Sequence, residues 1–169
     1  DRRFRAGLAL ARYQPTSDAW SEEDAEFLAN QLVATNPVYQ PLAWPALRGI
    51  QDRLLSPLGQ IFDDDEEPDS HRVAAANAFA SFIPDEKYTL ADLMLRATPE
   101  QFEILYPLIH SAQETKSRLT QLVSSAPHPS MGSEARVAFG QSRAGAAITL
   151  LRQGEREASF DTLRTSDDP

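Results

Sequence analysis

The residues best able to carry chemistry are three histidines, His71, His110 and His128. Histidine is the usual general base and metal ligand near neutral pH. A helical zinc site needs two histidines four residues apart, as in H-E-x-x-H, and these three lie in separate segments. We expect His71 in the first turn of a helix, His110 at the end of another and His128 in a loop. All three are interpreted as structural or solvent-exposed.

Carboxylates form the densest charge run, residues 63–67, and a second candidate pair at Glu100 and Glu103. The run suggests a cation site or a landing surface for a basic partner. A calcium-binding EF-hand loop, however, needs spaced oxygens and a central glycine, and both are missing. The run is therefore interpreted as a solvated loop between helices. The pair has the spacing of a solvated helix face, although paired carboxylates also serve acid–base catalysis.

No sequence pattern of a known active site occurs in the chain. It contains neither a phosphate-binding glycine loop, nor a G-x-S-x-G elbow, nor the H-R-D and D-F-G signatures of kinases. The absence of cysteine excludes disulfides, cysteine nucleophiles and thiolate metal sites. The sequence therefore predicts no catalytic, cofactor-binding or metal-ligating residue, and no cofactor.

Composition indicates a globular helical chain with an acidic surface. The 169 residues are 41% hydrophobic and carry a formal net charge of -9. This charge disfavours nucleic acids and anionic membranes as partners, and no apolar run has the length of a membrane span. The lack of cysteine fits a reducing compartment, so we expect the cytoplasm. Because the chain begins with Asp1 and not with Met, we expect it to be a piece of a longer protein.

Two further groups are candidate contact residues. Arginines cluster at the start of the chain, at Arg2, Arg3, Arg5 and Arg12. A basic helix edge can touch phosphates, but given the acidic charge we expect these arginines to pair with acids of an adjacent helix outside this segment. Trp20 and Trp44 are of the type enriched at interfaces, and core packing is the interpretation preferred for both.

The elements that must position these residues are predicted to be helices. Apolar periodicity indicates a helix over 3–13, and Ser21 followed by three acids indicates the start of a second. Asn36-Pro37 and Ser56-Pro57 are interpreted as further helix starts, with breaks or kinks at Pro41 and Pro45. Asp69 is expected to cap a helix over 70–82.

The second half follows the same logic. Thr89 is expected to cap a short helix, and Thr98 with Gln101 forms a capping box with a proline at the first helical position. A kink is expected at Pro107. Further helices are predicted over 114–124, over 133–153 with Gly154 as the stop, and over 155–163.

An internal repeat with a spacing of 69 residues is indicated by three helices. It aligns small residues at Gly7, Ala76 and Gly145, and large apolar residues at Leu10, Phe79 and Ile148 and at Tyr13, Phe82 and Leu151. The prediction is one close-packed helix used three times, in which small residues admit a neighbouring backbone and large ones fill the remaining gap.

A family resemblance is carried by residues 3–12 and 143–151, and by residues 97–102 together with residues 105–108. They resemble the HEAT-like helical region of large bacterial multidomain proteins. In those proteins an N-terminal serine/threonine kinase domain is joined to a C-terminal domain similar to formylglycine-generating (sulfatase-modifying) enzymes. The resemblance implies a parent protein. It implies no activity for this segment, because no catalytic residue of either enzyme is present.

The expected fold is all-α, an α-solenoid of HEAT/armadillo-like antiparallel helix pairs, as a single repeat domain over residues 1–169. The expected function is a non-catalytic protein-interaction or spacer module that contacts a partner protein or a neighbouring domain of its own chain. The alternative is the helical portion of an enzyme whose site is completed elsewhere. Nucleic-acid binding is ranked last because of the charge.

Overall fold

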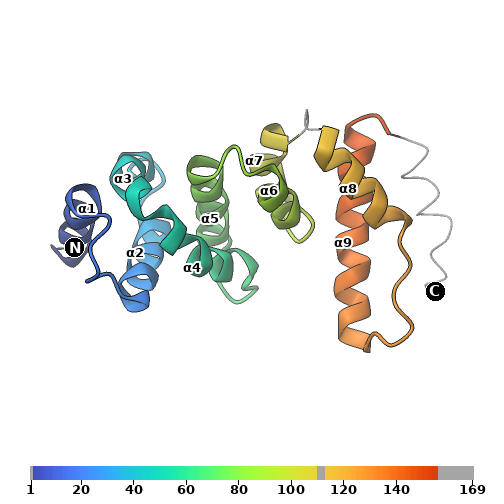
Figure 1. Cartoon of the computed structure of the whole chain (residues 1–169), viewed down its shortest axis with the longest axis horizontal. Helices are drawn as coiled ribbons and strands as arrows, with labels where there is room; N and C mark the ends of the chain where they lie inside the picture. Colours follow the sequence, from blue (N-terminus) through green and yellow to red (C-terminus); the bar gives the residue numbers. More distant parts are fainter. Residues whose placement is uncertain (1, 110–112, 156–169) are drawn as a thin grey trace. The chain divides into compact units, whose positions relative to one another are not determined.

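The computed structural model describes residues 2–109 and 113–155, and over these ranges the chain is all-helical without a β-strand. The all-α prediction is therefore confirmed. The chain forms two compact units, residues 1–84 and residues 85–169 (Figure 1). A single repeat domain over residues 1–169 stays a prediction.

The first unit is organised around its last helix. Its elements are α1 (Arg2–Tyr13), α2 (Glu22–Ala34), α3 (Gln40–Leu47), the 3₁₀ helix η1 (Arg48–Ile50), α4 (Gln51–Asp63) and α5 (Asp69–Phe82). α5 packs against α2, α3 and α4, and α1 packs against α2, α3 and η1. Because α5 has neighbours on several sides, its alanines Ala74, Ala75, Ala76 and Ala78 are all buried.

Two predicted helix starts at prolines are wrong. α3 begins at Gln40 and not at Pro37, because residues 36–39 form a turn in which the Val38 N–H donates to Asn36 Oδ1 at 3.0 Å. α4 begins at Gln51, so Pro57 lies inside the helix and not at its start. Proline in a helix interior costs about 3 kcal/mol.

Burial explains why α4 tolerates this proline. Leu54, Leu58, Ile61 and Phe62 form one buried face of the helix. Each such side chain contributes about 1.5–3 kcal/mol when it is fully buried, so together they outweigh the lost hydrogen bond. Pro45 likewise lies inside α3, which continues to Leu47 before the chain tightens into η1.

Two predicted caps are shifted by a few residues. Asp69 is the first residue of α5, and Pro68 occupies the position before it. Thr89 lies inside α6, which begins at Lys87. In both cases the polar residue sits in the first turn, where acids and hydroxyls are common, so the sequence pattern alone did not separate the cap from the turn.

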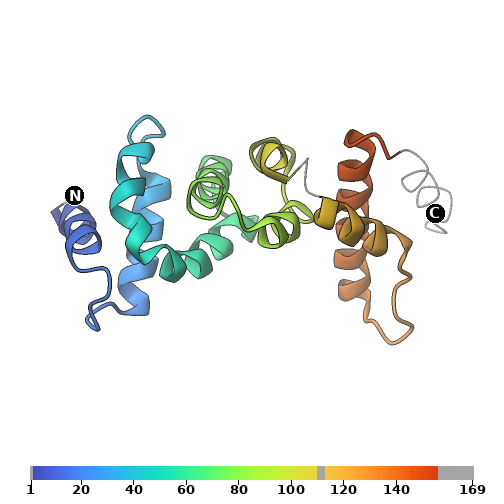
Figure 2. The same ribbon diagram turned by 45° about the horizontal axis from the view of Figure 1, so that its top comes forward.

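The second unit contains α6 (Lys87–Met94), α7 (Pro99–Ile109), α8 (Gln113–Ser124) and α9 (Ser133–Arg152). α6 packs against α7 and α8, and α8 packs against α9 (Figure 2). The core between α8 and α9 consists of Leu119, Val123, Ala146, Ala147 and Leu150. α8 and α9 run antiparallel, since Arg143 donates to the Val123 carbonyl while Lys116 pairs with Glu155.

Two predicted signals at helix ends are confirmed in the second unit, the capping box at the start of α7 and the glycine that ends α9. The Gln101 N–H donates to Thr98 Oγ1 at 3.3 Å and the Thr98 N–H donates to Gln101 Oε1 at 2.7 Å, which is the predicted capping box. Gly154 has a φ of 88° and ends α9. Its N–H donates to the Leu151 carbonyl and the Glu155 N–H to the Leu150 carbonyl, the pattern of a Schellman motif. The helix predicted over 155–163 lies outside the described residues, apart from Glu155.

Two glycines of α9 allow a matched test of how closely this helix approaches the backbone at Leu95. A Cβ on Gly145 would lie 3.1 Å from the backbone oxygen of Leu95, whereas a Cβ on Gly140 would meet nothing within 4 Å. We expect Gly140→Ala to raise the free energy of unfolding by up to about 1 kcal/mol through helix propensity. Gly145→Ala should bring no such gain, because a neighbouring backbone cannot rotate away.

Urea unfolding followed by circular dichroism measures both variants. Equal stabilisation by the two substitutions would show that α9 does not approach Leu95 closely.

Candidate protein-interaction faces

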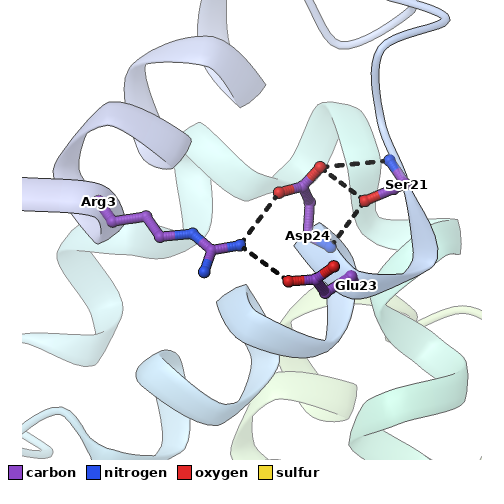
Figure 3. Close-up of polar contacts among 4 residues, drawn as sticks. All are labelled: Arg3, Ser21, Glu23 and Asp24. Atoms are coloured by element: carbon purple, nitrogen blue, oxygen red, sulfur yellow. Dashed lines mark hydrogen bonds and ion pairs between the residues drawn. The ribbon is translucent and has the colours of Figure 1, made fainter.

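The junction between α1 and α2 is built from a helix cap and one arginine (Figure 3). The Asp24 N–H donates to Ser21 Oγ at 3.1 Å, and the Ser21 N–H donates to Asp24 Oδ2 at 3.4 Å. Arg3 Nη2 of α1 lies 3.5 Å from Asp24 Oδ1 and 3.7 Å from Glu23 Oε1. Its guanidinium carbon also lies 4.2 Å from the ring centre of Phe27.

This junction corrects one expectation and perturbs one carboxyl group. Arg3 pairs with acids of α2 in the same chain, and not with a helix outside the segment. The hydrogen bonds from Ser21, and then the charge of Arg3, lower the pKa of Asp24. The ionised carboxylate therefore holds the start of α2 and the edge of α1 together.

The other three arginines of α1 lie on its exposed side. Within the described residues Arg2, Arg5 and Arg12 have no ion pair or hydrogen bond. The same side carries Tyr13, whose side chain is 78% exposed. α1 thus has an inner side, centred on buried Ala11, and a basic outer face.

α9 has apolar residues on two opposite sides. One side, formed by Ala146, Ala147 and Leu150, is buried against α8. The other side is exposed and consists of Val137, Ala144, Ile148 and Leu151. Successive members are seven, four and three residues apart, so they lie on one side of the helix. We call these four residues the outer face of α9. An amphipathic helix with a single covered stripe needs no second apolar stripe, so this exposed face is a candidate interaction surface.

Large apolar residues at positions related by the 69-residue spacing differ in burial between α5 and α9. Phe79 and Phe82 of α5 are 3% and 4% exposed, and Phe79 packs edge-on against Phe62 of α4 with ring centres 5.9 Å apart. At the matching positions of α9, Ile148 and Leu151 are 51% and 44% exposed. The prediction that large residues fill the gap in all three copies is therefore wrong for α9.

The same prediction is also wrong for α1, where Leu10 and Tyr13 are exposed. The small positions agree better. A Cβ on Gly7 would meet Leu28 at 2.7 Å, a Cβ on Gly145 would meet the Leu95 backbone, and Ala76 is fully buried. Close packing at the small residue is thus common to the three helices, while burial of the large residues is confined to α5.

A polar groove of about 420 Å³ lies between α2 and α4. Its walls include the carboxylates of Glu22, Glu26 and Asp52 beside the guanidinium of Arg53. No histidine lines it, and among the described residues no three acids or histidines are grouped so that they could hold a metal ion. The groove therefore combines carboxylates with the hydroxyls of Ser21 and Ser56, and the Ser21 hydroxyl donates to Asp24 Oδ2 at 2.7 Å as part of the α2 cap.

The titratable residues singled out in the sequence lie apart. His71 Nδ1 is 3.0 Å from Glu67 Oε2, and His128 Nδ1 is 2.7 Å from Ser130 Oγ in an exposed loop. His110 lies outside the described residues. In the acidic run, Asp65 pairs with Arg72 at 3.0 Å, as fits a loop between helices.

The remaining candidates have structural surroundings. Glu103 pairs with Arg152 of α9 on the surface, and Trp20 is buried with its indole N–H donating to the Gln14 carbonyl at 3.1 Å. Core packing is confirmed for Trp20, and Trp44 is half-buried. None of the described helices is long and apolar enough to cross a membrane.

Sequence reasoning missed the outer face of α9. The signal was present, because two apolar stripes can be read from residues 133–152, but the sequence does not say which stripe a neighbour covers. Comparisons of the chain with protein families, with curated proteins and with solved structures found no match. The faces and the groove are therefore interpreted from their own chemistry.

The cap of α2 yields a pH-dependent prediction. The pKa of Asp24 is lowered in the folded state, so its stabilising effect is complete above the usual aspartate value of about 3.9 and is lost as pH falls through the lowered pKa. Asp24→Asn should lower the free energy of unfolding at pH 7 by about 0.3–1 kcal/mol, because it removes a negative charge from the first turn of α2.

Urea unfolding of both proteins between pH 7 and pH 2.5 tests this, and the difference should narrow below about pH 4. A difference that stayed constant over the whole range would mean that the ionised carboxylate does not hold the junction.

Proposed function

We propose that this chain is a non-catalytic protein-interaction or spacer module. The observation that carries the proposal is the outer face of α9, an apolar stripe that α8 does not cover. An apolar stripe exposed on a helix is a surface to which a partner helix can bind. The partner is a protein or a neighbouring domain of the same chain; a nucleic acid or a membrane would be repelled by the net charge of -9.

We further propose that the helices are stacked as an α-solenoid of HEAT/armadillo-like antiparallel pairs. Two pairs support this, α8 with α9 and α4 with α5. In the latter, Arg48 of η1, just before α4, donates to the Ser81 carbonyl at the end of α5, while Arg72 at the start of α5 reaches the Phe62 carbonyl at the end of α4. The shared close packing at Gly7, Ala76 and Gly145 supports a repeated unit.

The parent protein we propose is a multidomain signalling protein of the type the sequence resembles, with a serine/threonine kinase domain, acting in the cytoplasm. In such a protein the segment would regulate or space the attached domains. The alternative function, the helical portion of an enzyme, is favoured by one observation, the carboxylate-lined groove between α2 and α4. No histidine lines that groove, so a catalytic site there would need a further acid–base group or a cofactor from elsewhere.

Site-specific photo-crosslinking in the cells that make the protein tests the module proposal. A benzophenone amino acid replaces Ile148 or Leu151 in the outer face of α9, and Asn30, an exposed residue of α2, serves as the control position. We expect a protein adduct of defined mass from the first two positions and none from the third. Equal adduct yields at all three positions would contradict the proposal.

A further inference from the structure

The exposed side of α1 combines small residues, one aromatic and three arginines. Ala6, Ala9 and Tyr13 are separated by three and four residues, so they lie along one line on the helix and are exposed. Arg5 and Arg12, seven residues apart, lie along one edge of this line, and Arg2 lies at its end. We call these six residues the outer face of α1.

The charges of this face are not balanced within the described residues. α1 contains no acidic residue, and Arg3 has its acids on α2 whereas Arg2, Arg5 and Arg12 have none. Arg2 and Arg5 also lie at the start of α1, where the helix dipole disfavours a cation by about 0.3–1 kcal/mol. An anionic group bound here would relieve both effects.

We propose that the outer face of α1 binds a short, acidic, amphipathic helix of a partner protein. The alanines admit close approach of the partner backbone, and Tyr13 offers a rigid aromatic contact of the type that dominates interfaces. The guanidinium groups of Arg5 and Arg12 pair with carboxylates on the partner helix in the two-pronged geometry that arginine favours. This inference rests on the proposed function, whose partner it describes chemically.

Charge and length together favour a short helix over a polyanion. α1 is 12 residues long, which corresponds to about 18 Å along its axis. The chain as a whole carries a charge of -9, and Glu22 and Glu23 begin the adjacent helix. A nucleic acid extending beyond α1 meets these acids and is repelled, whereas a helix of matching length stays within the basic face.

Binding of a designed peptide to the whole chain tests the proposal. The probe is an acetylated peptide of about 14 residues, which spans about 20 Å as a helix, with leucines at helical spacing and glutamates beside them. A scrambled peptide of the same composition keeps the charge but has no apolar stripe. Fluorescence anisotropy measures both at physiological salt.

Two double variants distinguish the contribution of the outer face of α1 to peptide binding from the effect of the net charge of the chain. Arg5→Glu with Arg12→Glu alters the face, and Arg118→Glu with Arg136→Glu makes the same change of net charge at exposed residues of α8 and α9. Arg5→Glu places an acid near the start of α1, where the helix dipole favours it, and Arg12→Glu places one in the last turn, where the dipole disfavours it by a similar amount, so the two effects on folding offset each other. We expect the first variant to weaken binding by about tenfold or more, and the second to change it about threefold at most.

A peptide with lysine in place of glutamate should in turn bind the first variant better than the unaltered chain. Tyr13→Ala should weaken binding of the designed peptide and leave binding of the scrambled one unchanged. Equal binding of the designed and scrambled peptides, or an unchanged affinity in the Arg5→Glu, Arg12→Glu variant, would overturn the proposal.

A single-stranded RNA of equal charge, if it bound more tightly than the peptide and depended on Arg5 and Arg12, would also overturn it. Adducts at Ile148 together with failure of the peptide would refute this inference alone. Adducts missing at Ile148 with specific peptide binding at α1 would refute the proposed role of α9 and keep this face.

Discussion

Close approach of helices at alanine and glycine is the contact on which the rest of the structure depends. Ala75 and Ala76 of α5 are fully buried, and Gly145 of α9 lies against the backbone of Leu95. A small residue at such a point lets two helices approach closely, so that the larger side chains beside it pack densely against the neighbouring helix. The number of neighbours then decides what each helix exposes. α5 has several and is buried on most sides, whereas α1 and α9 each keep one side open.

The starts of helices were predictable where the chemistry is local. Ser21 and Thr98 hydrogen-bond to residues three positions ahead, and Gly154 adopts the positive φ that ends α9. All three signals are complete within a few residues. The positions of the prolines were predicted wrongly because proline is accepted in the first turn of a helix and, at a cost in stability, in the helix interior. At Pro57 the buried face of α4 decided the outcome, and burial is a property of the packed unit.

The open faces could be predicted only in part. The arginines of α1 were visible as a cluster in the sequence. Only the structure distinguishes Arg3 from the others, because α2 places Glu23 and Asp24 within ion-pair distance of it. The repeat spacing placed Phe79 and Ile148 at matching positions. Residues at matching positions in a sequence repeat need not have the same packing neighbours. Phe79 has Phe62 against it, and Ile148 is half exposed. The exposure of these residues is the basis of the module proposal.

The proposal that the helices stack as an α-solenoid is tested most directly by solution X-ray scattering of the whole chain. A compact domain of this length has a radius of gyration of about 15 Å. The proposed solenoid predicts a clearly larger value, independent of concentration, with the angular profile of an elongated folded particle. A value of about 15 Å would contradict the solenoid and would indicate a compact domain instead.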